Sequence, residues 1–377
     1  MNSKKEDIMC MKRALYLAEK GRGFTSPNPM VGALVVKDGI VIGEGFHKKA
    51  GTPHAEVIAI ENAHHKTVGA TLYVNLEPCC HKNKRTPPCT EAIIKAGIKR
   101  VVVAMEDPNP EVSGRGIEFL KKHGVEVECG VLGEEAKKLN EVFIKYITTK
   151  TPFVIMKIAQ SIDGKIATSS YESKWITGEK ARMYVQELRH MYDAVLVGIG
   201  TLLFDDPSLT ARIKGGINPY RIILDSTLRI PLSSKVIREN VDSKTIIATT
   251  EQRANREKLS ILKDMGIKIL ILPCDNRGFV DIRELLRVLG RLEISSVLVE
   301  GGSNINASFL RAGVVDKVIF FIAPMIIGGS DAISSIGGLS PETLDSAIKI
   351  KRMRVDMVGN DILIEGYIDG ETKEDTK

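Results

Sequence analysis

The residues most able to do chemistry lie in three short stretches near the start of the chain. They supply an imidazole and a carboxylate at His54 and Glu56, and thiols at Cys79 and Cys89. Imidazole and thiolate are zinc ligands, and a site with three protein ligands keeps one position open for water. A carboxylate beside that water can move its proton. The pattern predicts a hydrolytic Zn²⁺ site with His54, Cys79 and Cys89 as metal ligands and Glu56 as the catalytic proton shuttle.

A proline accompanies each of these groups, which predicts that a helix begins at each. Thr52 is expected to cap a helix whose first residue is Pro53, with His54 and Glu56 in its first turn. Pro78 and Pro88 precede the two cysteines in the same way. The partial positive charge of a helix N-terminus favours the thiolate that binds metal.

The adjacent Cys80 is an alternative to Cys79 as the first thiol ligand. Only one of Cys79 and Cys80 is expected to join Cys89, and the Pro78-Cys79 pair favours Cys79. His81 as a further ligand would close the site and remove the water, so a role on the substrate side is expected for it.

Alternating helices and strands organise the first half of the chain. Helices are expected at 4–20, from Pro53, after Pro88, at 116–123 and at 133–147, and strands at 31–36, 40–44, 71–76, 100–104 and 125–128. Asp38-Gly39 is a two-residue hairpin signal between the first two strands. This order predicts a three-layer α/β sandwich.

A short polar segment, Thr148-Thr149-Lys150-Thr151-Pro152, marks the expected domain boundary, which gives domains 1–148 and 149–377. Strands are then expected at 153–159, 194–198, 221–225, 245–248, 268–272, 296–300, 318–323 and 362–368, and helices at 179–190, 252–265, 281–290 and 303–312. These elements predict an α/β domain with a large mixed sheet that carries helices on both faces.

Composition excludes several classes of protein. Acidic and basic residues are interspersed and the net charge is only +6 over 377 residues, so a basic nucleic-acid-binding face is not expected. No apolar run approaches the ~20 residues of a membrane span, and the N-terminus does not have the apolar core of a signal peptide. A cytoplasmic location without a membrane partner is expected.

The first half resembles the deaminase half of the bifunctional riboflavin biosynthesis proteins of the RibD family. The resemblance rests on the segments 27–32, 43–47, 54–56, 76–79 and 86–89. It implies a cytidine-deaminase-like fold, with Asn28 and His47 in the pyrimidine pocket and His81, Arg85 and Thr86 near the ribose phosphate. The family interval between the two cysteines holds eight residues where this chain has nine, which keeps Cys80 as an alternative.

The second half resembles the reductase half of the same family, through the segments 157–167, 175–177, 188–189, 205–212 and 299–304. The resemblance implies a dihydrofolate-reductase-like fold that uses NADPH. It places Ala159, Trp175, Thr201, Asp205, Gly301, Gly302, Ser303 and Asn304 at the cofactor, and Lys157, Ser173, Arg189, Leu209, Arg212 and Glu300 at the sugar-phosphate substrate. Lys157 and Asp205 would lie beside the reacting ribose carbon, and two arginines can clamp one phosphate.

The resulting prediction is a bifunctional enzyme of riboflavin biosynthesis, expected to be a homo-oligomer. One domain removes an amino group from a phosphoribosylated pyrimidine, and the other reduces the ribosyl chain with NADPH. An alternative is a nucleic-acid or tRNA deaminase with an unrelated C-terminal domain. A zinc-stabilised binding module, closed by Cys80 or His81 as a fourth ligand, is a second alternative.

Overall fold

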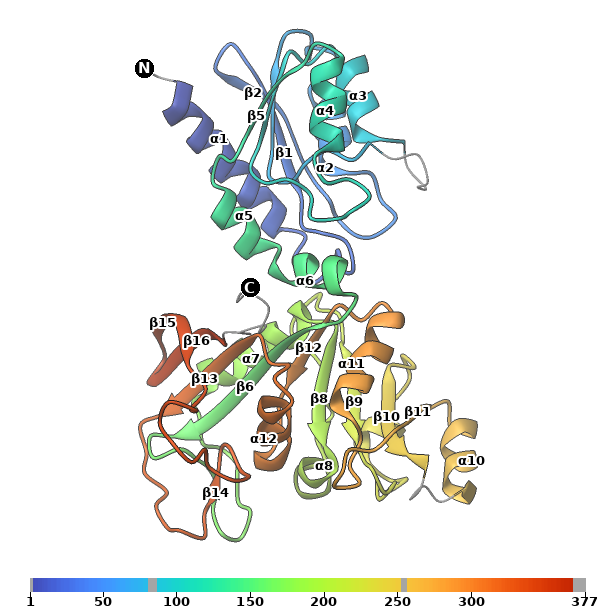
Figure 1. Ribbon diagram of the computed structural model, residues 1–377, viewed down its shortest axis with the longest axis vertical. Coiled ribbons are helices and arrows are strands. Elements are labelled where there is room, and N and C mark those ends of the chain that lie inside the picture. The colour runs from blue at the N-terminus through green and yellow to red at the C-terminus, as the bar shows by residue number, and fades with distance from the viewer. Residues whose placement is uncertain (1–2, 81–86, 252–255, 369–377) are drawn as a thin grey trace. The chain divides into compact units, whose positions relative to one another are not determined.

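The computed structural model describes residues 3–80, 87–251 and 256–368. The chain divides into two compact units, Met1–Lys150 and Thr151–Lys377 (Figure 1). The division lies two residues beyond the predicted boundary at 148.

Unit 1 is built on a five-stranded sheet in the order β2-β1-β3-β4-β5. The strands are β1 (Gly32–Lys37), β2 (Ile40–Phe46), β3 (Thr71–Val74), β4 (Arg100–Val103) and β5 (Glu126–Cys129). The β1–β2 hairpin turns at Asp38-Gly39, both with positive φ, as the sequence predicted. β1 is antiparallel to β3, whereas β3, β4 and β5 run parallel.

Helices cover both faces of this sheet, which confirms the predicted three-layer sandwich. They are α1 (Ser3–Glu19), α2 (Ala55–Asn62), α3 (Cys89–Lys95), α4 (Arg115–Lys122), α5 (Gly133–Leu139) and α6 (Glu141–Thr149). α1 packs on β1 and β3 and also contacts α5, whereas α2, α3 and α4 form a contiguous row (Figure 1). The single helix predicted over 133–147 is two helices that meet at Asn140.

Two glycines set the position of α2, the helix that carries Glu56. A Cβ on Gly43 would lie 2.1 Å from the carbonyl oxygen of Ala59, and one on Gly45 would lie 2.4 Å from that of Ala55. The backbone of α2 therefore lies directly on β2, at a distance that any larger residue would prevent.

The predicted helix starts are correct for one of the three prolines. α3 begins at Cys89 with Pro88 as its N-cap, as expected. α2 begins at Ala55, so His54 is the N-cap and lies outside the first turn, while the Thr52 hydroxyl donates to the carbonyl of Lys49. No helix begins at Cys79, which lies in the loop after β3 in the part of the chain described here.

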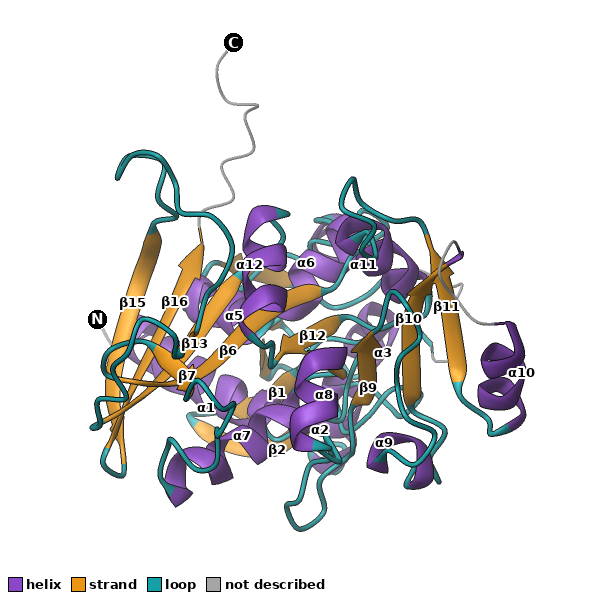
Figure 2. Ribbon diagram, turned by 90° about the horizontal axis from the view of Figure 1, so that it is seen from below, coloured by secondary structure: helices purple, strands orange, loops and turns teal. Residues whose placement is uncertain are grey.

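Unit 2 contains a nine-stranded mixed sheet in the order β11-β10-β9-β8-β12-β6-β13-β16-β15. The strands are β6 (Phe153–Ser161), β8 (Ala194–Gly198), β9 (Tyr220–Leu224), β10 (Thr245–Thr250), β11 (Lys268–Leu272), β12 (Ser296–Val299), β13 (Lys317–Ala323), β15 (Ile350–Val358) and β16 (Asp361–Ile368). The run from β11 to β13 is parallel, and β16 and β15 are antiparallel additions at one edge (Figure 2).

Helices cover both faces of this sheet too, as predicted. They are α7 (Glu179–Met191), α8 (Ile199–Asp205), α9 (Lys235–Arg238), α10 (Arg256–Asp264), α11 (Ile282–Arg291) and α12 (Ser303–Arg311). Alternate residues of β8 belong to two core clusters: Leu196 lies in one with residues of α11 and α12, whereas Val197 lies in the other with residues of α8, α9 and α10. This alternation follows from the two-residue period of a strand.

The sequence prediction missed several elements of unit 2. They are the edge strand β15, the short pair β7 (Lys165–Ala167) and β14 (Ile333–Ser334), and the helices α8 and α9. α8 has only seven residues and directly follows a buried strand, so its apolar residues read as strand and turn. Among the described residues, no helix is long and apolar enough to cross a membrane.

Candidate active sites

Unit 1 brings the predicted metal ligands together although they come from three separate segments. One ligand atom each from His54, Cys79 and Cys89 lies within 4.8 Å of the others. The Nδ1 atom of His54 is 3.1 Å from Sγ of Cys89 and 3.6 Å from Sγ of Cys79. Cys79 and Cys89 are buried.

These separations suit a tetrahedral zinc ion. Zinc–nitrogen and zinc–sulfur bonds of ordinary length place two such ligand atoms about 3.5 Å apart along a tetrahedral edge. The hydrogen bond with Cys79 and burial hold the pKa of the Cys89 thiol well above its usual range, and a bound cation would reverse this by favouring the thiolate. Donor type, spacing and burial all fit Zn²⁺.

Glu56 lies in the first turn of α2 beside this cluster and is only 3% exposed. Burial raises the pKa of its carboxyl above the ordinary value, which the neighbouring His54 partly opposes. Its Oε2 atom has no hydrogen-bond partner among the described residues. An unpaired buried carboxylate oxygen is costly unless a ligand or solvent molecule meets it.

Asn28 and His47, which the resemblance assigns to the pyrimidine pocket, contact each other beside the cluster. Nδ2 of Asn28 is 3.3 Å from Nε2 of His47, and Nδ1 of His47 is 3.3 Å from the carbonyl of Pro53. The rings of His47 and His54 make an edge contact with centroids 5.6 Å apart. An amide and an imidazole therefore lie within reach of the ring edge of a bound heterocycle.

Among the described residues, the group of possible metal ligands contains Cys79 and does not contain the adjacent Cys80. His81, Arg85 and Thr86 lie outside the described residues.

In unit 2 the dominant feature is a nearly buried group of charges on β6, α7 and the end of β12. Glu300 accepts from Nε and Nη2 of Arg189 at 2.6 and 3.0 Å, and Nζ of Lys157 lies 3.2 Å from its Oε2. Burial alone would raise the pKa of Glu300, but Arg189 and Lys157 lower it to about 2. Glu300 is therefore an anion held between two cations.

Asp205 is the last residue of α8. Its side chain binds the loop that precedes α7 and so connects this loop to α8. Its Oδ1 atom accepts from Oγ of Ser173 at 3.1 Å and lies 3.3 Å from Nζ of Lys174. The next residue, Trp175, is 66% exposed, which excludes it from the core, and the guanidinium of Arg182 lies 4.7 Å from its ring centroid. A large apolar ring left open to solvent is available to a planar ligand.

The glycine turn after β12 leads into α12. Gly301 and Gly302 have φ values of 50° and 95°, in the region that favours glycine, and Gly302 is the N-cap of α12. The hydroxyl of Thr201 donates to the carbonyl of Gly301 at 3.0 Å, and a Cβ on Gly302 would lie 2.9 Å from that hydroxyl. Ser303 and Asn304 follow at the start of α12, where free N–H groups suit a phosphate.

The remaining predicted substrate and cofactor residues have different surroundings. Ala159 is a half-buried residue of β6. Leu209 as a whole residue is only 2% exposed and packs in the core beside α8. Arg212 is exposed, whereas Arg189 is committed to Glu300 and to the carbonyl of Thr210 at 3.3 Å. A phosphate would therefore reach Arg212 without competition, but would compete with Glu300 for Arg189.

Sequence reasoning assigned no role to three buried polar residues of unit 1, namely Asn75, Glu77 and Asn140. Their side chains hold loops that carry predicted site residues, and each is no more than 3% exposed. A polar residue inside a run of apolar ones, as in Val74-Asn75-Leu76-Glu77, was the available signal.

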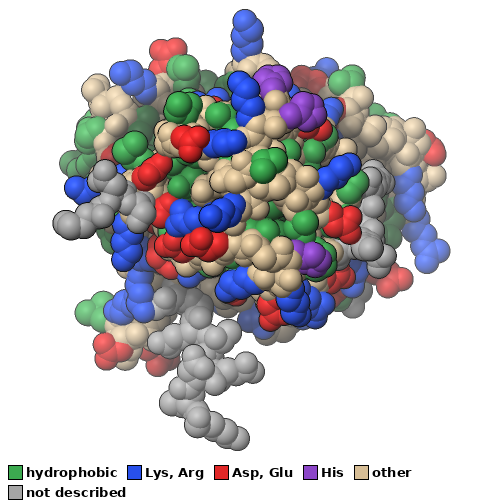
Figure 3. Space-filling model, turned by 90° about the horizontal axis from the view of Figure 1, so that it is seen from above, with side chains coloured by type: hydrophobic (Ala, Val, Ile, Leu, Met, Phe, Trp, Pro, Cys, Tyr) green, Lys and Arg blue, Asp and Glu red, His purple; other side chains and the backbone are tan. Residues whose placement is uncertain are grey.

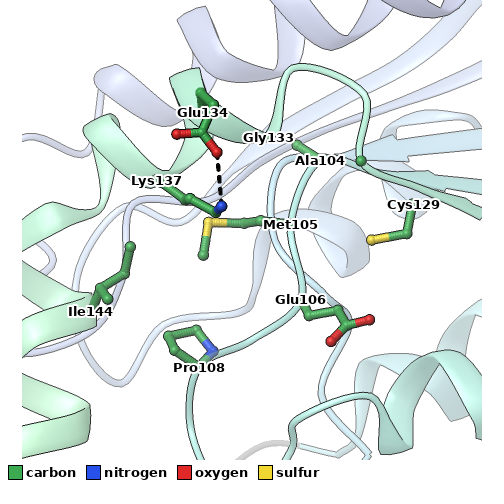
Figure 4. A pocket seen from close by; sticks show the side chains of 10 residues that line it. Ala104, Met105, Glu106, Pro108, Cys129, Gly133, Glu134, Lys137 and Ile144 are labelled. Atoms are coloured by element: carbon green, nitrogen blue, oxygen red, sulfur yellow. Dashed lines mark hydrogen bonds and ion pairs between the residues drawn. The ribbon is translucent and has the colours of Figure 1, made fainter. Parts of the chain in front are cut away.

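The surface carries two further features, an open pocket and a face of mixed charge. An open pocket of about 520 Å³ lies beyond the ends of β4 and β5 and includes the ion pair of Lys137 with Glu134, 2.8 Å long (Figure 4). It contains none of the predicted site residues. On the face drawn in Figure 3, basic and acidic side chains are interspersed.

The three-layer unit with its His/Cys/Cys cluster and buried glutamate defines a zinc-dependent deaminase fused to a second α/β unit. Residues 4–105 match the family described as the cytidine and deoxycytidylate deaminase zinc-binding region, and residues 152–364 match the RibD C-terminal domain. The chain belongs to the RibD family, the bifunctional deaminase and reductase proteins of riboflavin biosynthesis.

Relatives of known name span nearly the whole chain. The riboflavin biosynthesis protein RibD of Aquifex aeolicus is 47% identical over 94% of this chain and 96% of its own length, and that of Actinobacillus pleuropneumoniae is 45% identical over 95% and 94%. A Thermotoga maritima structure described as a diaminohydroxyphosphoribosylaminopyrimidine deaminase and 5-amino-6-(5-phosphoribosylamino)uracil reductase has a TM-score of 0.86, with 43% identity and coverage of 97% and 99%. The match to the RibD C-terminal domain does not favour a nucleic-acid deaminase with an unrelated second domain.

Proposed function

We propose that unit 1 hydrolyses the 2-amino group of 2,5-diamino-6-ribosylamino-4(3H)-pyrimidinone 5′-phosphate. We propose further that unit 2 reduces the ribosyl chain of the resulting 5-amino-6-(5-phosphoribosylamino)uracil to ribityl. The single observation that carries the proposal is the buried His54, Cys79 and Cys89 cluster beside the unpaired oxygen of Glu56.

In the deaminase unit, His54, Cys79 and Cys89 hold Zn²⁺ and Glu56 moves the proton. Bound zinc supplies a Lewis acid that makes water nucleophilic near neutral pH. Glu56 would take one proton from the attacking water and pass it to the ring nitrogen, and would then carry the proton of the added hydroxyl to the amine that leaves as ammonia. Its burial supports this role, because burial raises the pKa of the carboxyl and so makes it a stronger base than an exposed glutamate.

Asn28 and His47 orient the pyrimidine in this proposal. The side-chain amide of Asn28 and the ring nitrogen Nε2 of His47 are 3.3 Å apart, so both can meet the same edge of the pyrimidine. They supply both donor and acceptor groups for the heterocycle edge, and the burial of His47 excludes water from that edge.

In the reductase unit, NADPH supplies the hydride when it is bound. Ala159, Trp175, Thr201, Asp205 and the turn Gly301–Asn304 are proposed to hold the cofactor. The exposed ring of Trp175 and the glycine turn at the start of α12 support this assignment.

The sugar phosphate is proposed to contact Lys157, Ser173, Arg189, Leu209, Arg212 and Glu300. Glu300 accepts hydrogen bonds from ribose hydroxyls and fixes Lys157 beside the reacting carbon, because it already holds Lys157 at 3.2 Å. Leu209 is buried beside α8, so it is proposed to shape the site by packing.

A coupled assay on the full chain tests both steps. The purified, zinc-loaded protein is expected to release ammonia from the diaminopyrimidine substrate and then to oxidise NADPH. Absence of ammonia would refute the deaminase assignment. Ammonia release without NADPH oxidation on the deaminated intermediate would refute the reductase assignment alone.

The protein is proposed to act as a homo-oligomer on small molecules. The edge strand β15 exposes Met353, Val355 and Met357, each more than half exposed, on alternate positions. An exposed apolar edge strand promotes pairing with another strand, and antiparallel pairing with a second copy satisfies a twofold axis. Light scattering of the purified protein tests this, and a monomer at micromolar concentration would contradict it.

A cytoplasmic location is proposed as well. The described cysteines are all free, and the proposed zinc ligands require reduced thiols. Fractionation of cells that express the protein is the test, and recovery in the periplasm would contradict the proposal.

A further inference from the structure

The five residues that follow β3, Asn75 to Cys79, are held by contacts to different parts of unit 1. Asn75 is fully buried and Glu77 is 3% exposed, and neither side chain contributes to the metal cluster. Buried polar groups are maintained when each of their hydrogen bonds is made.

Asn75 holds the loop that precedes β1. Its Oδ1 atom accepts from the backbone N–H of Gly32 at 2.8 Å, and its Nδ2 atom donates to the carbonyl of Met30 at 3.0 Å. Asn140 binds Met30 as well: its Oδ1 atom accepts from the backbone N–H of Met30 at 2.8 Å, and its Nδ2 atom donates to the carbonyl of Met30 at 3.0 Å. This loop carries Asn28, and the carbonyl of Val31 within it accepts from the N–H of His47 at 2.8 Å.

Glu77 holds the segment that leads into α4. Its Oε2 atom accepts from the N–H groups of Asp107 and Gly114 at 3.0 and 2.9 Å. Its Oε1 atom accepts from those of Gly116 and Ile117 at 2.8 and 3.2 Å. The carboxylate thereby satisfies free N–H groups at the start of α4, where negative charge is stabilised.

The contacts of Glu77 also restrict the position of Cys79, the first thiol ligand. Only Pro78 separates Glu77 from Cys79, and a Cβ on Gly116 would lie 2.1 Å from the carbonyl of Pro78, so the loop and α4 are in close contact. The carbonyl of Cys79 accepts from the N–H and hydroxyl of Thr90, both at 3.3 Å, on the other side. The backbone that carries the Cys79 thiol is therefore fixed from two directions.

We infer that Asn75 and Glu77 are positioning residues with separate tasks in the proposed deaminase: Glu77 fixes the thiol of Cys79 for the metal, and Asn75 fixes the loop of Asn28 for the pyrimidine. The inference rests on the proposed function. A residue needed only for folding would affect both properties together, whereas separate tasks predict separate losses.

Glu77→Gln tests the first task, because an amide N–H would face the two N–H groups that Oε2 now satisfies. Zinc affinity of the full chain is measured with Zn²⁺ alone, by competition with a chromophoric chelator. The dissociation constant is expected to rise by about 10- to 100-fold, with the pyrimidine KM at saturating zinc nearly unchanged. Glu118→Gln is the matched control, since Glu118 is an exposed glutamate of α4, the helix whose start Glu77 contacts, and it should leave zinc affinity unaltered.

Asn75→Ala tests the second task. It leaves the N–H of Gly32 without its acceptor, so the KM for the diaminopyrimidine is expected to rise about tenfold while zinc affinity stays at the wild-type value. Asn62→Ala, on the exposed end of α2, is the matched control. Circular dichroism and NADPH oxidation establish that each variant is folded, and Glu77→Asp replaces Glu77→Gln if the latter is not.

Unchanged zinc affinity in Glu77→Gln and Glu77→Asp would overturn the role of Glu77, and an unchanged KM in Asn75→Ala would overturn that of Asn75. Parallel loss of zinc affinity and pyrimidine binding in both variants would overturn the division of tasks. Wild-type protein that binds zinc and releases ammonia keeps the proposed function intact in all these cases. A wild-type protein without either property would refute the proposed function itself.

Discussion

Arg189 and Glu300 form a two-pronged ion pair in unit 2, with Nε and Nη2 of the guanidinium 2.6 and 3.0 Å from the two carboxylate oxygens. Both side chains are about one-tenth exposed, and Lys157 is a second cation on the same carboxylate. Glu300 has two cationic partners, whereas Arg189 has one carboxylate partner. We therefore expect substitution of Glu300 to destabilise unit 2 more than substitution of Arg189.

Glu300→Gln is expected to destabilise unit 2 by about 3–5 kcal/mol, because it leaves two buried cations without their anion. Arg189→Met should cost less, about 2–3 kcal/mol, since Lys157 still faces the carboxylate. Urea unfolding followed by the fluorescence of Trp175, the single tryptophan, reports on unit 2. Glu257→Gln, an exposed change, is the control, and equal losses in both variants would contradict the argument.

Acid should destabilise unit 2 through the same carboxylate. The pKa of Glu300 is lowered from 4.5 to about 2 in the folded protein, so its contribution is present above pH 4.5 and is lost as the pH falls toward 2. The expected loss is about 3 kcal/mol. Urea midpoints measured across this range should fall less steeply in Glu300→Gln than in the wild type. Identical slopes would show that Glu300 does not titrate as inferred.

Glu56→Gln should separate the two activities. The amide cannot accept the proton of water, so deamination should fall by at least about 10²-fold, while zinc content and NADPH-dependent reduction stay at wild-type levels. Metal analysis and the two assays on one preparation decide this. Loss of reduction as well would mean that the units do not act independently.

Cys79→Ser and Cys80→Ser form a matched pair of adjacent substitutions. Cys79 lies in the ligand cluster and Cys80 does not, so only Cys79→Ser should lose bound zinc and deaminase activity. Metal content after gel filtration is the measurement. Retention of zinc by Cys79→Ser with loss in Cys80→Ser would assign the ligand to Cys80, as the eight-residue interval of the family would suggest.

Removal of the metal should affect one unit only. Incubation with a strong chelator is expected to abolish ammonia release and to expose the thiols of Cys79 and Cys89 to a thiol reagent, while NADPH oxidation continues. Addition of zinc should restore deamination and protect both thiols. Unchanged ammonia release in metal-free protein would refute the zinc-dependent mechanism.

Trp175 provides a direct test of the cofactor assignment, because it is the single tryptophan and is 66% exposed. Binding of NADPH over its ring should quench its emission and reduce its accessibility to acrylamide. Titration of the wild-type protein gives the affinity, and Trp175→Phe should weaken it. An emission that NADPH leaves unchanged would place the cofactor elsewhere.

The sequence by itself determined the zinc ligand types, the three-layer unit and most strands of the mixed sheet. These features depend on local patterns: each His-x-Glu, Pro-Cys or apolar run of strand length is contained in a few consecutive residues. The short helix α8 and the edge strand β15 escaped prediction, because tertiary contacts stabilise them more than their own pattern does.

Only the tertiary structure decided which groups meet. It placed Cys79 rather than Cys80 in the ligand cluster, paired Arg189 with Glu300, and brought Glu77 to the start of α4. Each of these contacts joins residues far apart in the sequence, so spacing along the chain does not encode it. The physical reason is that a buried charge or polar group must find its partner, and the packing of the sheet and helices determines which partner is within reach.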